Sequence, residues 1–176
     1  MILEERIKKA IRDVPDFPKE GIIFKDITPI LQDAQLCKDI VVDLSKKFLE
    51  MGIEGVAGIE SRGFIFGQAL AIEMNVPFIP IRKKGKLPYH VVSHAYDLEY
   101  GSAEIEMHTD AVSENQKILV HDDLLATGGT AAAAAELILM QGARVEAFNF
   151  IVDLTFLNGE NAISKYSKNI ITLARY

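Results

Sequence analysis

The run HDDLLATGGT at 121–130 constrains the fold of this chain more than any other segment. It follows an apolar, strand-like segment at 118–120 and precedes an apolar, helix-like segment at 131–140. A strand that passes through so short a connection into a helix is typical of the βαβ units of α/β folds. The run therefore predicts a parallel sheet, with these polar residues near the carboxyl end of a strand, where such sheets bind ligands.

The glycines and threonines of this run have the chemistry of a phosphate-binding turn. Gly128 and Gly129 lack a Cβ, so the backbone can come close to an anion at the positive end of the next helix. The hydroxyls of Thr127 and Thr130 can donate to phosphate oxygens. No lysine follows the glycines, which excludes the phosphate loop of nucleoside triphosphatases. We expect these four residues and Ala126 to bind the phosphate of a sugar phosphate.

Two carboxylates precede the turn. Asp122 and Asp123 accept hydrogen bonds when ionised, which suits a ribose diol or an outer-shell contact with a metal-bound ligand. His121 is interpreted as a satisfied residue at the strand end rather than as a catalytic base. An ordinary strand–turn–helix with glycine at the turn is the alternative for the run as a whole.

The composition narrows the class of protein. A chain of 176 residues, 49% hydrophobic and 25% charged, can bury a full core as one domain without disulfides. Its net charge of −6 disfavours nucleic acid as a partner, because nucleic acid needs a basic surface. The single Cys37, interpreted as a core residue, cannot form an internal disulfide. Neither a signal peptide nor a membrane-spanning run is evident, so we expect a cytoplasmic protein without membrane partners.

Strand-like and helix-like segments alternate along the chain. This alternation is typical of a doubly wound, mostly parallel sheet flanked by helices. The segment at 83–101 lacks a sustained period, and a stretch of this length without regular structure is usually a lid, a binding loop or disordered. The predicted helices cover 2–11, 33–52, 63–74, 131–140 and 158–166, and the predicted strands cover 55–59, 76–81, 103–108, 117–120, 145–154 and 169–174.

Four segments, in order along the chain, resemble the type I phosphoribosyltransferases. DDLLATGGT at 122–130 resembles the signature for phosphoribosyl pyrophosphate, in the form found in the members that act on adenine. The matches run from about residue 17 to residue 154. The other segments are FPKEGIIFKDITPIL at 17–31, similar to the part that covers the base, GIESRGFIFG at 58–67, similar to the pyrophosphate loop, and IRKKGKLP at 81–88 with YDLEYGSAEIE at 96–106, similar to the mobile catalytic loop.

The resemblance implies an enzyme of purine salvage. It implies transfer of the phosphoribosyl group of 5-phospho-α-D-ribose 1-diphosphate to adenine, giving AMP and diphosphate, with Mg²⁺ bound mainly by substrate and water. It also implies a single domain over 1–176, with an N-terminal helix and hood at 1–32 and a mobile loop at 83–101. Family members are usually homodimers. An enzyme for another base, such as hypoxanthine or guanine, and a non-catalytic regulator are the alternatives.

Two strand ends carry candidates for binding the pyrophosphate. Ser61 and the neighbouring N–H groups can bind an anion, and Arg62 offers a planar fork of donors. The resemblance implies that pyrophosphate binds at this turn, together with Glu60, often beside a non-proline cis peptide. Arg82 and Lys83 follow the next strand and can stabilise pyrophosphate as it leaves. Without the resemblance, a surface turn with a solvated arginine is an equal alternative.

The resemblance also implies how adenine is bound and deprotonated. Phe24 stacks on the purine, the backbone beside Ile23 and Lys25 reads its edge, and Leu154 forms an apolar floor. The sequence alone would place Phe24 and Leu154 in the core.

Two residues of the loop are implied in the chemistry. Glu99 manages the proton that adenine loses, which is worth about 10²–10⁴-fold in rate. Tyr100 helps to close the site, and Asp97 is expected to have no task. His90, His94 and His108 lack the spacing of a zinc site, so no metal is expected to bind directly to the protein.

Overall fold

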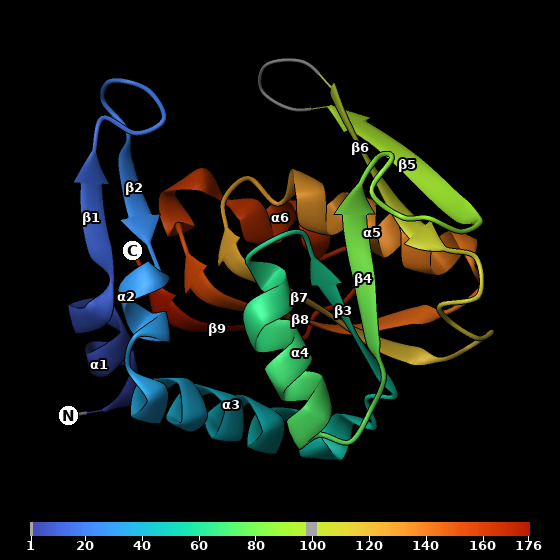
Figure 1. Cartoon of the computed structure of the whole chain (residues 1–176), viewed down its shortest axis with the longest axis horizontal. Helices are drawn as coiled ribbons and strands as arrows, with labels where there is room; N and C mark the ends of the chain where they lie inside the picture. Colours follow the sequence, from blue (N-terminus) through green and yellow to red (C-terminus); the bar gives the residue numbers. More distant parts are fainter. Residues whose placement is uncertain (1, 98–101) are drawn as a thin grey trace.

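A single large sheet organises the chain. In the computed structural model, which describes residues 2–97 and 102–176, seven strands form this sheet in the order β5-β6-β4-β3-β7-β8-β9 (Figure 1). The mostly parallel arrangement confirms the predicted fold class. The parallel strands are β3 (Gly55–Ile59), β4 (Phe78–Lys83), β7 (Lys117–Leu125), β8 (Arg144–Asp153) and β9 (Ile170–Arg175), and the antiparallel strands are β5 (Val91–Asp97) and β6 (Ser102–His108).

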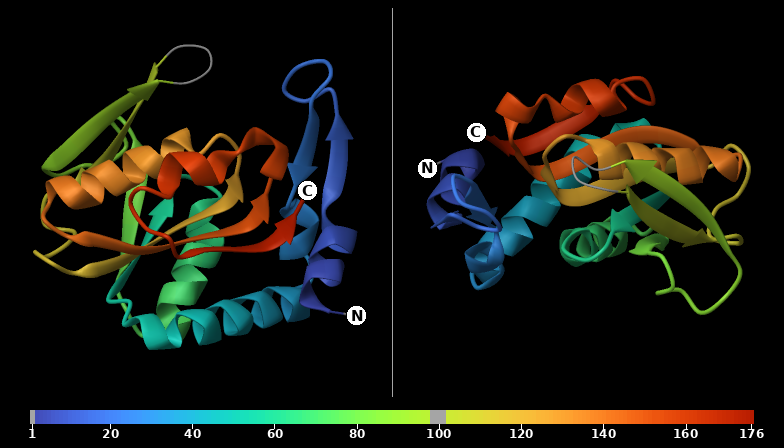
Figure 2. Two further views of the ribbon diagram at one scale, coloured as in Figure 1. Left: turned by 180° about the vertical axis from the view of Figure 1, so that it is seen from behind. Right: turned by 90° about the horizontal axis from the view of Figure 1, so that it is seen from above.

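Helices cover both faces of the sheet, as Figure 2 shows. Successive residues of β7 point to opposite faces, so Ile118 and Val120 join one core and Leu119 joins the other. The first core lies under α5 (Gly129–Met140) and α6 (Gly159–Ile163). The second lies under α1 (Leu3–Ala10), α3 (Ala34–Phe48) and α4 (Gly63–Glu73). In the described ranges, no helix is both long and apolar enough to cross a membrane.

The strand order places two strand ends side by side where a ligand can enter. β3 lies between β4 and β7, and pairs in parallel with both. The chain leaves β3 through α4 to reach β4 on one side, whereas β7 occupies the other side. Such a reversal of strand order opens a crevice at the carboxyl ends. The turns that follow β3 and β7 therefore meet there.

The N-terminal segment contains a hairpin that the sequence did not predict. β1 (Arg12–Pro15) pairs antiparallel with β2 (Ile23–Asp26), and a cis Phe17–Pro18 bond lies between them. The prolines were expected only to end the first helix. The hairpin rises above the carboxyl ends of the parallel strands (Figure 1). The short helix α2 (Thr28–Leu31) connects it to α3. Asp33 caps α3, since its side chain accepts the N–H of Leu36 at 2.9 Å.

Two sequence predictions need correction. The segment 83–101 was expected to lack regular structure, but β5 occupies much of it and pairs with β6, for example through Val92 opposite Met107. This pairing forms an arm that lies across from the hairpin, on the other side of the molecule (Figure 1). The strand at 103–108 was predicted, but the local pattern at 91–97 does not show that this segment pairs with it. β7 also extends to Leu125, so Asp122 and Asp123 lie within the strand rather than beyond it.

Candidate functional site

The turn between β7 and α5 presents unpaired backbone amides. Gly128 is the N-cap of α5 and has φ of 80°, a left-handed conformation that glycine adopts without strain. Across the described chain, no backbone N–H from 126 to 131 donates to a protein acceptor. The turn lines a small cavity of about 80 Å³ together with Asp122 and Phe150. These amides are therefore available to an anion at the positive end of the helix.

The first residue of α6 supports this turn from behind. A Cβ on Gly128 would overlap the carbonyl oxygen of Gly159, and a Cβ on Gly159 would overlap the carbonyl oxygen of Ala126. The two backbones can approach this closely only because both residues are glycines. The sequence predicts a helix at 158–166 but gives no sign that its first residue contacts the turn.

The acid pair, Asp122 and Asp123, lies beside the turn, and hydrogen bonds partly compensate its negative charge. Asp123 is only 3% exposed, and its Oδ2 accepts a hydrogen bond from Nε of Arg62 at 2.5 Å. Asp122 accepts the backbone N–H of Asp123 through Oδ1 at 2.8 Å. Burial, and then the Asp123 carboxylate, raise the pKa of Asp122 well above its ordinary value. Both effects reduce the negative charge that a phosphorylated ligand would meet.

The turn after β3 completes a second cavity, of about 240 Å³. The peptide bond between Glu60 and Ser61 is cis, as the resemblance implied. The cavity is lined by Glu60, Ser61, Arg62, Lys83, Asp122 and Asp123. Since Asp122 also lines the cavity of the β7–α5 turn, the predicted phosphate, ribose and pyrophosphate residues lie together.

Arg82 takes a different position from its predicted companions. It donates to Glu60 at 3.1 and 3.3 Å and to the carbonyl of Lys86 at 3.1 Å, and it does not line the 240 Å³ cavity. Burial would raise the pKa of Glu60, but hydrogen bonds from Arg82 and from the Lys83 N–H lower it below its ordinary value. Glu60 thus stays charged and connects the ends of β3 and β4.

The residues predicted to bind a base lie on the hairpin and at the end of β8. The guanidinium carbon of Arg62 lies 5.3 Å from the centre of the Phe24 ring, which places Phe24 close to the acid pair. Ile23 is exposed, and Leu154 donates its N–H to the carbonyl of Leu125 at 3.0 Å. The Lys25 side chain turns away to Asp13, at 2.7 Å, so only its backbone suits the predicted role.

The arm contributes a contact that the sequence did not single out. The hydroxyl of Tyr96 in β5 lies 3.1 Å from Oγ1 of Thr130 in the β7–α5 turn. Glu99 and Tyr100, which were predicted to act in the chemistry, lie outside the described residues. Their positions remain predictions.

His121 lies inside β7 rather than at its end, and only one of its nitrogens has a partner. Nδ1 lies 2.7 Å from Oδ1 of Asn149, whereas Nε2 has no hydrogen-bond partner among the described residues. Burial lowers the pKa of His121 to about 4, although Asn149 and Asp123 oppose this shift. The imidazole is therefore neutral near pH 7. Asn149 gave no signal in the sequence, because its role depends on the neighbouring strand.

We predict that His121 makes the stability of the protein depend on pH. Because its folded-state pKa lies below the unfolded value of 6.5, the unfolded chain binds the proton more readily. The stabilisation is full above pH 6.5 and is lost as the pH falls toward about 4, by up to about 3 kcal/mol. Urea unfolding of wild type and His121→Leu at pH 7.5 and 4.5 measures this loss, which the variant should largely lack. His90→Gln, at an exposed position, is the control; equal losses in wild type and His121→Leu would contradict the prediction.

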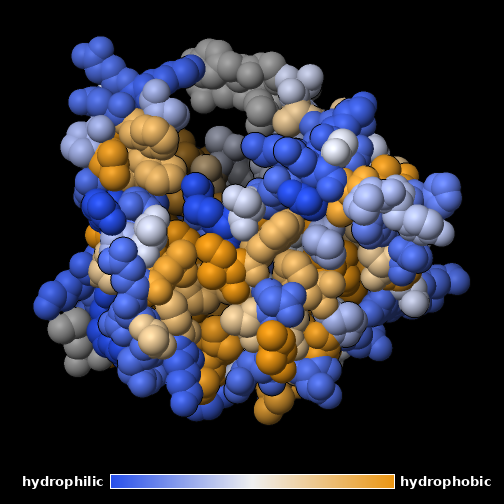
Figure 3. Space-filling view, viewed as in Figure 1, coloured by the Kyte–Doolittle hydropathy of each residue, from blue (hydrophilic) through white to orange (hydrophobic). Residues whose placement is uncertain are grey.

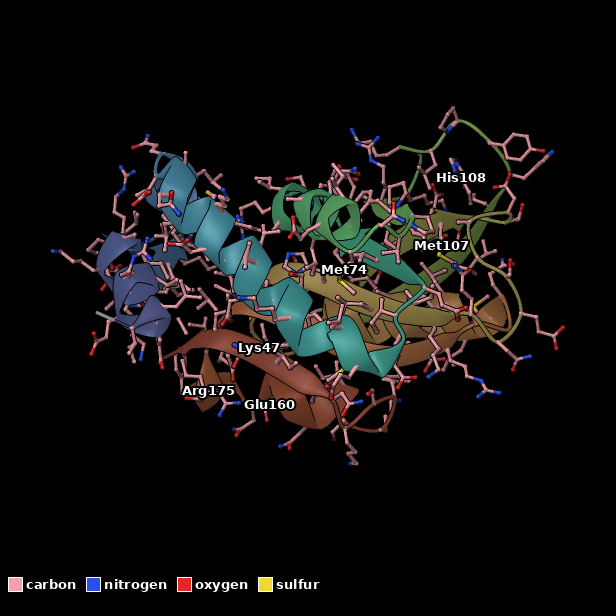
Figure 4. The ribbon with its side chains drawn as sticks, turned by 90° about the horizontal axis from the view of Figure 1, so that it is seen from below. Lys47, Met74, Met107, His108, Glu160 and Arg175 are labelled. Atoms are coloured by element: carbon pink, nitrogen blue, oxygen red, sulfur yellow. The ribbon has the colours of Figure 1, made fainter. Side chains whose placement is uncertain are left out.

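Asp153, the residue before Leu154, is a second buried acid. Asp153 is 1% exposed, and neither carboxylate oxygen has a hydrogen-bond partner in the described part of the chain. Arg175 lies 3.7 Å from Asp153 and 3.1 Å from Glu160 (Figure 4). Burial, and then the Glu160 carboxylate, raise the pKa of Asp153 above its ordinary value. This cluster connects the ends of β8 and β9 to α6.

Comparisons with known proteins identify close relatives along nearly the whole chain. The family model described as a phosphoribosyl transferase domain matches residues 25–173. An adenine phosphoribosyltransferase from Cytophaga hutchinsonii is 49% identical and covers 99% of this chain and 97% of its own length. A crystal structure of adenine phosphoribosyltransferase from Thermoanaerobacter pseudethanolicus has a TM-score of 0.95 at 45% identity, covering 99% of this chain and 100% of that one. The Saccharomyces cerevisiae enzyme, complexed with an imino-altritol bisphosphate and adenine, has a TM-score of 0.89 at 38% identity, covering 97% and 98%.

Proposed function

The chain belongs to the adenine phosphoribosyltransferases, and from this we propose how the residues at the carboxyl ends of its strands share the chemistry. It transfers the 5-phosphoribosyl group of 5-phospho-α-D-ribose 1-diphosphate to adenine, giving AMP and diphosphate, a reaction of purine salvage. One observation supports these roles above all: the turns after β3 and β7 lie next to each other, and Asp122 lines the cavities of both.

Each part of the substrates has its own set of residues in this proposal. The free amides of the β7–α5 turn support a site for the 5′-phosphate, and the acid pair beside it supports a site for the ribose diol. The proposed sets are Ala126, Thr127, Gly128, Gly129 and Thr130 for the 5′-phosphate; Asp122 and Asp123 for the ribose; Glu60, Ser61, Arg62, Arg82 and Lys83 for the pyrophosphate; and Ile23, Phe24, Lys25 and Leu154 for adenine.

The hairpin and the arm frame the site in this proposal. Residues 1–32 act as the hood over the base, and the segment 83–101 closes over the substrates. The resemblance implies a transition state with cationic character at the ribose, which water would intercept. Closure then excludes water and brings Glu99 to the ring nitrogen of adenine, with Tyr100 beside it.

A coupled assay for diphosphate release, run with a panel of free bases, tests the proposal. Adenine should be used rapidly, and hypoxanthine and guanine should be used poorly. The backbone N–H and C=O beside Ile23 and Lys25 must match the donor and acceptor pattern of an amino-purine, and a mismatch leaves buried polar groups unpaired. Rapid use of hypoxanthine would overturn the assignment of the base.

We propose that Mg²⁺ accompanies the diphosphate. Over residues 2–97 and 102–176, no group of three or more His, Cys, Asp or Glu side chains is placed to hold a metal ion. In this proposal the magnesium ion keeps most of its waters and binds through substrate oxygens, with Asp122 and Asp123 in outer-shell contact. When bound, the ion neutralises charge on the leaving diphosphate.

Removal of magnesium should therefore abolish activity. We expect a chelator in excess over the metal to reduce diphosphate release to background, and added Mg²⁺ to restore it. The same chelator should leave the thermal unfolding midpoint of the protein without substrates unchanged, because in this proposal substrate oxygens and water hold the ion. A rate that survives chelation would remove the metal from the scheme.

Asp123→Asn tests the proposed ribose site. The amide cannot reproduce the charge-assisted bond to a hydroxyl, and such bonds are worth about 1.5–3 kcal/mol. We expect KM for the phosphoribosyl donor to rise by about tenfold or more, while KM for adenine changes little. Asp26→Asn, on the hairpin, is a carboxylate control, because Asp26 lines neither the 80 Å³ nor the 240 Å³ cavity. An unchanged KM for the donor in Asp123→Asn would count against the ribose role.

We also propose that the chain forms a homodimer in the cytoplasm. Figure 3 shows apolar side chains gathered over α3 and α4. A groove of about 430 Å³ between these helices includes Ile65 and Ile72, the latter 69% exposed. An exposed apolar face of this kind supports a partner surface. Light scattering at micromolar protein should give twice the mass of the chain, and a monomer would contradict the proposal.

A further inference from the structure

A tyrosine from the arm contacts a residue that is proposed to bind the 5′-phosphate. The hydroxyl oxygen of Tyr96 lies 3.1 Å from Oγ1 of Thr130, within hydrogen-bond distance. Tyr96 is half-buried and packs against the core under α5, so its ring is held in place. Thr130 is the second residue of α5, and its own N–H donates to no protein acceptor in the described chain.

A phosphate at the turn would fix the direction of this hydrogen bond. Either hydroxyl can be the donor in the protein alone. The Thr130 hydroxyl has one proton, and a charged phosphate oxygen is a stronger acceptor than a phenol oxygen. Once that proton points to the phosphate, Oγ1 of Thr130 can only accept, and Tyr96 can donate to it. The two hydrogen bonds then polarise each other in the same direction.

We propose that Tyr96 is a positioning residue for the 5′-phosphate, because it orients the Thr130 hydroxyl toward the phosphate. This inference rests on the proposed function, since it requires the phosphate at the β7–α5 turn. It also connects two separate elements of the site, because Tyr96 lies in β5 of the arm and Thr130 in the β7–α5 turn. Binding of the phosphate strengthens the contact between them.

The test measures product affinities in wild type and in three variants. Calorimetry gives Kd for AMP, which has the 5′-phosphate, and for diphosphate, which lacks it. We expect Tyr96→Phe to raise the Kd of AMP by about 3- to 10-fold, the range for one net hydrogen bond, and to leave the Kd of diphosphate unchanged. Thr130→Ala should weaken AMP at least as much. In the double variant, Tyr96→Phe should add less than about twofold, because its partner is already absent.

Tyr166→Phe is the matched control. The Tyr166 hydroxyl also hydrogen-bonds a side chain of α5, that of Glu136, but away from the turn. Its loss should leave the Kd of AMP unchanged. Thermal unfolding midpoints of all variants check that each one is folded at the temperature of the titration.

The outcomes separate the inference from the proposed function. If Thr130→Ala weakens AMP but Tyr96→Phe does not, the inference is overturned and the phosphate site stands. The inference is also overturned if Tyr96→Phe reduces AMP affinity by the same factor in wild type and in the Thr130→Ala background. If Thr130→Ala itself leaves AMP affinity unchanged, the proposed contact of the Thr130 hydroxyl with the 5′-phosphate fails, and the inference fails with it.

Discussion

Replacing Glu99 with glutamine is expected to lower kcat by about 10²- to 10⁴-fold, with a much smaller change in either KM. Adenine must lose a proton as its ring nitrogen bonds to the ribose carbon. A carboxylate can take that proton, and the amide of glutamine cannot. The two side chains have nearly the same size and shape, so substrate binding should largely persist. The effect therefore falls on the chemical step.

Steady-state kinetics with both substrates varied measures this effect. Asp97→Asn is the matched control, because it removes a neighbouring carboxylate that is expected to have no task. Its kcat should stay within about twofold of wild type, which corresponds to about 0.5 kcal/mol or less. A turnover number near normal in Glu99→Gln would refute the proposed proton transfer, and a large loss in Asp97→Asn would show that the roles are exchanged.

The second large effect is expected at Gly159, which contacts no proposed substrate atom. A Cβ there would overlap the carbonyl oxygen of Ala126, which is backbone and cannot rotate away. Gly159→Ala must therefore displace either the turn or α6. A displacement of about 1 Å at a binding group can cost about 100-fold. We expect KM for the phosphoribosyl donor and Kd for AMP to rise at least about tenfold, whereas diphosphate affinity changes little.

The control for Gly159→Ala lies in the same helix. Asn161→Ala, unlike Gly159→Ala, adds no atom against the turn, because the Asn161 side chain is exposed and is only shortened. Its AMP affinity should match wild type. Both variants should be titrated well below their unfolding midpoints, so that loss of the folded state does not imitate loss of affinity. Unchanged AMP affinity in folded Gly159→Ala would mean that the turn does not need its support from α6.

Features that depend on neighbours in the sequence could be predicted from it. The β7–α5 turn is one example, because its glycines, its hydroxyls and the flanking apolar segments are contiguous. The cap of α3 by Asp33 is another, since it needs only residues three positions apart.

Features that depend on distant segments could not be predicted. β1 and β2 are four residues each and contain or flank prolines, so their pattern is too short to indicate a hairpin. β5 is a strand because β6 pairs with it. Gly159 supports the backbone of Ala126, and Asn149 hydrogen-bonds His121. In both pairs the partners lie far apart along the chain. No local period reports such contacts.

The ion pair between Arg62 and Asp123 has a consequence for how tightly the site can hold its ligands. These two side chains satisfy each other in the protein, at 2.5 Å, although they are proposed to contact different parts of the same donor molecule. Binding is then an exchange of partners: the diol takes over the carboxylate while the diphosphate takes over the guanidinium. An exchange yields less net free energy than the meeting of two unsatisfied charges. The same exchange favours product release, because Arg62 and Asp123 form their ion pair again as the products leave.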